Sequence, residues 1–81
     1  MSNRKTPDEE AQAAYDFWQR VAIADRVDRG HPLGPDLRAE AEKLFGPLSD
    51  AEVRRIRTVM FNGRRYLSIT RAGKTRAILV N

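Results

Sequence analysis

The sequence predicts an α+β fold in which three helices precede a C-terminal antiparallel β-hairpin. Apolar residues recur at spacings of three and four up to Met60, which is typical of helices that bury one face. From Leu67 onward apolar and polar residues alternate instead, which is typical of strands. A chain of 81 residues is long enough for one domain. We therefore expect a single small domain over residues 6–81, preceded by a disordered N-terminus over residues 1–5.

The first helix has a defined start and a defined end. Thr6 can accept a hydrogen bond from the backbone N–H of Glu9, and Pro7 suits the first helical position because an N–H there would have no partner. Gly30 ends the helix, which we expect to run to about Arg29. The expected buried stripe follows the three-and-four spacing and comprises Ala11, Ala14, Tyr15, Trp18, Val21 and Ala22.

Three apolar side chains of this helix, Phe17, Ile23 and Val27, lie outside that stripe. A helix with a second apolar side is either covered twice within its own fold or offers that side to a partner. We expect these three residues to form a protein interface, either in a homodimer through the first helix or with a different protein.

Two further helices are expected after the loop that follows Gly30. Pro35 opens the second helix, and the Gly46-Pro47 pair ends it. Ser49 and Glu52 have the spacing of a capping box and open the third helix. The expected buried face of this third helix comprises Val53, Ile56 and Met60.

The pair Asn62-Gly63 permits two structures for residues 58–61. Gly63 can end the third helix in the left-handed conformation. Asn-Gly is equally a two-residue turn that joins two strands of a hairpin. The helical spacing of Met60 from Ile56 favours the first structure, so we expect the third helix to extend to Asn62.

Two short strands are expected after Gly63. Leu67 and Ile69 alternate with polar residues, and residues 75–80 alternate in the same way. Gly73 lies between them and can adopt a positive φ in a tight turn. These strands form the predicted hairpin.

Charge is divided unequally along the chain, whose formal net charge is +4. All of the acidic residues lie before residue 53. The charged residues after that point are Arg54, Arg55, Arg57, Arg64, Arg65, Arg71, Lys74 and Arg76. Arginine binds phosphate through a planar, two-pronged guanidinium. The division favours a basic face that meets a polyanion; the alternative is that these cations pair with carboxylates of the N-terminal helices.

The expected third helix presents a basic, hydrogen-bonding face that fits the DNA major groove. Arg54, Arg55, Thr58 and Asn62 lie opposite its apolar side. Arginine can bind guanine edges, asparagine can bind adenine, and threonine can reach a phosphate or a thymine methyl group. The remaining cations extend the predicted nucleic-acid-binding surface: Arg57, Arg64, Arg65, Arg71, Lys74 and Arg76.

The second helix, the break after it and the basic helix form a helix-turn-helix arrangement. Residues 62–74 follow, and they read Asn-Gly-Arg-Arg-Tyr-Leu-Ser-Ile-Thr-Arg-Ala-Gly-Lys. Residues 35–76 together resemble the winged helix-turn-helix family of DNA-binding domains. The resemblance implies a winged-helix-like fold with residues 51–62 as the recognition helix. It also implies that Arg64 and Arg65 contact the DNA backbone or minor groove.

Several classes of function lack the residues that they need. The chain has no cysteine and one histidine, His31, and it shows no pairing of a nucleophile with a base. We therefore expect no enzymatic activity, no cofactor and no metal site. No apolar run reaches the roughly 20 residues of a membrane helix, and the first residues do not form a secretory signal, so we expect a cytoplasmic protein.

The leading hypothesis is a small non-enzymatic protein that binds duplex DNA, such as a transcription regulator or a recombination accessory factor. The alternative is an adaptor or inhibitor whose basic face docks on an acidic protein partner. A third hypothesis is the binding of single-stranded RNA or DNA on the hairpin, where Tyr66 can stack on a base.

Overall fold

The computed structural model of the chain describes residues 6–81, and the predicted disorder of residues 1–5 lies outside this range. The elements in chain order are α1 (Pro7–Arg29), α2 (Pro35–Phe45), α3 (Asp50–Arg54), β1 (Arg57–Phe61), β2 (Arg64–Arg71) and β3 (Lys74–Leu79). The predicted α+β class, with helices first and an antiparallel sheet last, is confirmed. The sheet has three strands, and the predicted hairpin supplies two of them, β2 and β3.

The ends of α1 follow from the residues that were expected to cap it. The hydroxyl of Thr6 accepts a hydrogen bond from the N–H of Glu9 at 3.2 Å, and Pro7 occupies the first turn. Gly30 has a φ of 69°, a left-handed conformation that glycine adopts without steric cost. None of the helices in residues 6–81 is long and apolar enough to cross a bilayer.

The third helix is much shorter than expected. The capping box of Ser49 and Glu52 is present, but α3 ends at Arg54 after five residues. The prediction of a helix up to Asn62 is therefore wrong, and residues 58–61 belong to β1. The β-branched and aromatic side chains of this segment favour a strand. Met60, which helical spacing assigned to a buried face, is exposed.

Asn62 and Gly63 form the turn of the first hairpin. Both have positive φ, 51° and 75°, as a type I′ turn requires, and Phe61 lies opposite Arg64 in the register. The second hairpin repeats this geometry at Ala72 and Gly73, whose φ values are 51° and 75°. The two turns give an antiparallel sheet in the order β1-β2-β3.

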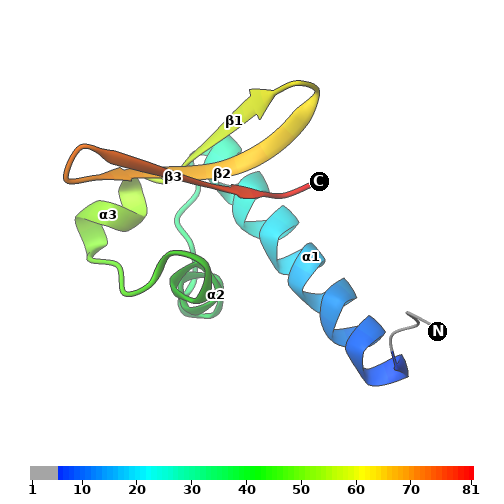
Figure 1. The fold of residues 1–81 in the computed structure, drawn as a ribbon. Coiled ribbons are helices and arrows are strands. Elements are labelled where there is room, and N and C mark those ends of the chain that lie inside the picture. Colours follow the sequence, from blue (N-terminus) through cyan, green and yellow to red (C-terminus); the bar gives the residue numbers. More distant parts are fainter. Residues whose placement is uncertain (1–5) are drawn as a thin grey trace.

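The core lies between the helices and one face of the sheet, and Figure 1 shows the helices on that side only. Leu67, Ile69 and Val80 supply the sheet side of the core. The helical side and its connections supply Ile23, Ala24, Ala41, Phe45, Leu48 and Ile56. The opposite face of the sheet is left without a helix.

The buried side of α1 differs from the predicted one, since only Val21 of the predicted stripe packs against the core. Ile23 has none of its surface exposed, and Val27 packs against the core, so these two do not form an outward-facing interface. Tyr15 and Trp18 are 50% and 64% exposed. The reason is that only the C-terminal part of α1 meets the sheet and α2, while the N-terminal part projects beyond them (Figure 1). Phe17, the third predicted interface residue, is partly buried.

Candidate nucleic-acid interface

The register divides the side chains of the sheet between a covered face and an open face. Leu67 and Ile78 lie opposite each other and point toward the helices, and neighbouring residues along each strand point the other way. The open face therefore carries Arg57, Val59, Phe61, Arg64, Tyr66, Ser68, Thr70, Thr75, Ala77 and Leu79.

One end of the open face combines exposed apolar side chains with a cation. Val59, Tyr66 and Leu79 form a row across the three strands, because each is the register partner of the next. Phe61, which is 64% exposed, lies beside this row, and Arg64 is its partner across the first hairpin. Exposed apolar groups next to a guanidinium suit a ligand that presents both flat apolar surface and negative charge.

The open face also has a shallow hollow of about 250 Å³, lined by Arg55, Arg57, Ser68 and Thr70. The guanidinium of Arg57 is fixed there, because its Nη1 donates to the carbonyl oxygens of Arg54 at 2.6 Å and Ile56 at 2.8 Å. Two guanidinium groups and two hydroxyl groups in one hollow, with no carboxylate among its lining residues, can accept an anion.

Arg65 is engaged within the molecule. It lies on the covered face, where its guanidinium forms an ion pair with Asp28 of α1. The hydroxyl of Thr58 donates to the same carboxylate. These contacts join α1 to β1 and β2, so the side chains of Arg65 and Thr58 hold the sheet on the first helix.

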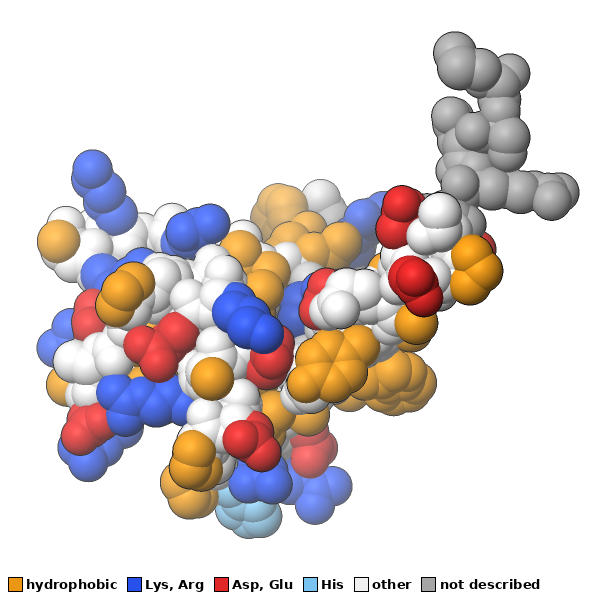
Figure 2. Space-filling view, turned by 90° about the horizontal axis from the view of Figure 1, so that it is seen from below, with side chains coloured by type: hydrophobic (Ala, Val, Ile, Leu, Met, Phe, Trp, Pro, Cys, Tyr) orange, Lys and Arg blue, Asp and Glu red, His pale blue; other side chains and the backbone are white. Residues whose placement is uncertain are grey.

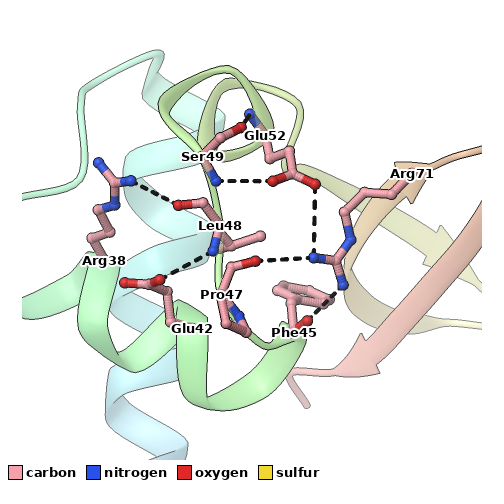
Figure 3. A network of polar contacts seen from close by, with 8 residues as sticks. All are labelled: Arg38, Glu42, Phe45, Pro47, Leu48, Ser49, Glu52 and Arg71. Atoms are coloured by element: carbon pink, nitrogen blue, oxygen red, sulfur yellow. Dashed lines mark hydrogen bonds and ion pairs between the residues drawn. The ribbon is translucent and has the colours of Figure 1, made fainter.

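Arg71 is also engaged, in the network of polar contacts shown in Figure 3. Its Nη2 donates to the carbonyl oxygen of Phe45 at 2.5 Å, and its Nη1 donates to that of Pro47 at 3.3 Å. A carboxylate oxygen of Glu52 lies 3.8 Å from the same nitrogen. Arg71 thus ties β2 to the connection between α2 and α3.

The same connection is braced from its other side. Arg38 donates to the carbonyl oxygen of Leu48 at 2.7 Å, and Glu42 accepts from the N–H of Leu48 at 3.0 Å (Figure 3). Arg38 also pairs with Asp50, and its hydrogen bond holds the pKa of that carboxyl below its ordinary value. The pKa of Glu52 is lowered chiefly by the hydrogen bond from the backbone N–H of Ser49.

A second set of cations is unengaged. Within residues 6–81, no ion pair or side-chain hydrogen bond involves the side chains of Arg54, Arg55, Arg64, Lys74 or Arg76. All of them are exposed. They lie at the end of α3, at the turn between β1 and β2, and along β3. The carboxylates instead lie on the helical side, where Figure 2 shows acidic and basic side chains interspersed.

The single helical surface predicted from Arg54, Arg55, Thr58 and Asn62 is not formed. α3 ends before Thr58, which lies in β1, and Asn62 lies in the hairpin turn. The structure instead brings Arg55 and Arg57 together at the hollow. Arg64 shares the open face with them, whereas Lys74 and Arg76 lie at positions of the covered face on the edge strand.

The apolar part of the open face was missed by the sequence reasoning. Val59, Phe61 and Leu79 are exposed and lie on it. Arg57, Val59 and Phe61 occupy every second position, which indicates a strand with these side chains on one face. The interpretation of residues 58–61 as a helix obscured this pattern.

The fold and the candidate interface were compared with known proteins. Searches against protein-family models, curated proteins and solved structures gave no match for the chain. The structure by itself shows a small α+β fold of helices followed by a three-stranded antiparallel sheet.

Proposed function

We propose that this protein is a non-enzymatic nucleic-acid-binding protein whose ligand is duplex DNA. The observation that carries the proposal is a set of exposed cations that form no ion pair within residues 6–81: Arg54, Arg55, Arg64, Lys74 and Arg76. Unpaired cations on the surface provide the electrostatic attraction that dominates the binding of DNA.

The open face of the sheet, together with its two hairpin turns, is the proposed contact surface. Strands of a sheet can enter a groove of DNA, so the short α3 is no obstacle to binding. Arg64 is placed to reach base edges, and the side chains of Val59 and Phe61 can contact thymine methyl groups. Arg55 and Arg57 at the hollow suit a backbone phosphate.

Of the parts that the resemblance to winged helix-turn-helix domains implies, the proposal keeps the wing and assigns it to the second hairpin. We propose that β2 and β3, with the turn at Ala72 and Gly73, act as the wing, with Lys74 and Arg76 meeting the DNA backbone. The recognition helix that the resemblance implied over residues 51–62 has no part in this proposal, because α3 ends at Arg54.

The test is the affinity of the full chain for a labelled DNA duplex, measured by fluorescence anisotropy. The double variant Arg55→Ala/Arg64→Ala removes two exposed guanidinium groups, and we expect its affinity to fall at least about tenfold. The matched control is the double variant Arg29→Ala/Lys43→Ala, which removes two exposed cations from α1 and α2 on the helical side. Equal loss in both variants would show that net charge alone is responsible and would contradict the proposed surface.

Competition in the same assay distinguishes the form of the nucleic acid. The proposal predicts that unlabelled duplex displaces the labelled duplex more effectively than a single strand of the same sequence. If the single strand competes better, and Tyr66→Ala abolishes that preference, then stacking of bases on the sheet is the mechanism instead.

One observation favours a second candidate function. The exposed side chains of Val59, Phe61 and Leu79 beside Arg64 would also suit an acidic protein partner with apolar anchors. Capture from a nuclease-treated lysate tests this candidate. A stoichiometric protein partner that is lost on Phe61→Ala would support it, and the absence of any such partner would contradict it.

A further inference from the structure

The N-terminal part of α1 carries the largest exposed aromatic surface among the helices that the structure describes. Trp18 is 64% and Tyr15 is 50% exposed, and Phe17 packs edge-on against Trp18 with ring centroids 5.2 Å apart. This part of the helix projects away from the sheet and from α2 (Figure 1). Figure 2 shows large hydrophobic side chains standing together on α1. Patches of this kind mark interaction sites.

The side of α1 turned away from the core forms a stripe with large side chains at its centre and alanines toward both ends, exposed except at the half-buried Ala22. Its members recur at spacings of three and four and are Ala11, Ala14, Tyr15, Trp18 and Ala22. Asp25, also exposed, continues the stripe toward the end of the helix. A stripe with alanines on both sides of an aromatic centre can pack against a second copy of itself, because the alanines let two helices approach closely on either side of the paired aromatic side chains.

The charges of α1 determine the direction in which two copies can pair. The first turn carries Asp8, Glu9 and Glu10. The last turn carries Arg26 and Arg29, and its one carboxylate, Asp28, is already paired with Arg65. In a parallel pair, the acidic first turns would lie side by side and repel. In an antiparallel pair, each acidic first turn lies beside the arginines of the other copy, and the two helix dipoles oppose each other favourably.

We propose that α1 is a self-association surface, on which α1 of a second copy of this chain packs antiparallel with Trp18 of both copies near the two-fold axis. In this arrangement Ala14 of one copy faces Ala22 of the other. The sheet of each copy takes no part, so the inference is independent of the proposed function. An interface of one helix from each copy is at the small end of specific interfaces, and we expect a dissociation constant of roughly micromolar order.

Sedimentation equilibrium of the full chain tests the surface. We expect a mass that rises from one to two copies with concentration. Trp18→Ala should raise the dissociation constant at least about tenfold, because aromatic residues at the centre of an interface dominate its stability. The matched control is Met60→Ala, which removes an equally exposed side chain, 65%, from β1. A monomer at every concentration, or equal weakening by both variants, would overturn the proposal.

Cysteine cross-linking tests the direction, because the natural chain has no cysteine. Ala11 and Asp25 lie equally far before and after Trp18, about two helical turns away on the same stripe. A mixture of Ala11→Cys and Asp25→Cys chains, one of them tagged, should form the mixed disulfide on mild oxidation. If Ala11→Cys instead forms disulfides with itself and the mixed species is absent, the pairing is parallel and the antiparallel proposal is wrong.

Discussion

At the scale of the residue, neighbouring arginines of the same hairpin have different roles. Arg65 and Arg71 are held by carboxylates and carbonyl oxygens of the helical part, whereas Arg64 and Arg76 are unengaged within residues 6–81. The unequal distribution of charge along the sequence could not separate these roles. Strand register distinguishes the roles of Arg64 and Arg65, because their side chains point to opposite faces of the sheet. For Arg71, the position of the connection between α2 and α3 is decisive, and that depends on tertiary packing.

Arg71 therefore belongs to the stability of the fold, and we predict that Arg71→Ala lowers the free energy of unfolding by about 2 kcal/mol. The substitution leaves the carbonyl oxygens of Phe45 and Pro47 without their charged donor. Urea denaturation followed by circular dichroism measures this change. Arg76→Ala is the control and should change the free energy by less than about 0.5 kcal/mol. Equal changes in the two variants would mean that the contacts of Arg71 do not hold the sheet on the helices.

At the scale of the element, the hairpin turns have the same backbone but different sequences. Asn62-Gly63 has the preferred residues, whereas Ala72 occupies the left-handed conformation at φ 51° without a side chain that favours it. We predict that Ala72→Asn raises the free energy of unfolding by about 0.5–1 kcal/mol. The reverse change in the first hairpin, Asn62→Ala, should lower it by a similar amount. Thermal unfolding monitored by circular dichroism compares them; a loss of stability in Ala72→Asn, or a gain in Asn62→Ala, would contradict the assigned turn geometry.

The short helix α3 gives a prediction for acid. The folded-state pKa of Glu52 lies below its ordinary value because of the hydrogen bond from Ser49, and that of Asp50 does so because of Arg38. A lowered pKa stabilises the folded state above the unfolded pKa, and this contribution is lost as the pH falls through the folded value. The unfolding temperature should therefore fall below about pH 4. Glu52→Gln should show a smaller fall than the wild type; an equal fall would mean that Glu52 does not contribute.

Local sequence signals predicted the capped ends of the helices better than the extent of α3. Thr6, Gly30 and Ser49 act through hydrogen bonds and φ values within a few residues, so their effects could be foreseen. The end of α3 depends on a competition between a helix and a strand pairing with β2. The spacing of apolar residues within one segment gives no information about a partner strand, so it could not reveal that residues 57–61 pair with residues 64–68.

At the scale of the whole molecule, the arrangement separates two surfaces. The helices carry the carboxylates, and the N-terminal part of α1 carries the exposed aromatic stripe. The end of α3, the sheet and its turns carry the unengaged cations. The side of α1 that enters the core was predicted wrongly, except at Val21. Both of its sides are apolar, and only the position of the sheet determines which one is buried. Ile23 therefore lies in the core and Trp18 on the surface.

The most direct measurement of the central claim is the salt dependence of duplex binding by the wild-type chain. Binding through the exposed cations around the sheet releases counterions from the DNA. For about five phosphate contacts, the logarithm of the association constant should fall against the logarithm of salt concentration with a slope of roughly −4.5. This corresponds to a loss of affinity of several hundredfold between about 50 and 200 mM salt. A slope near zero, or no detectable binding at the lower salt concentration, would contradict the claim that these arginines and lysine bind a polyanion.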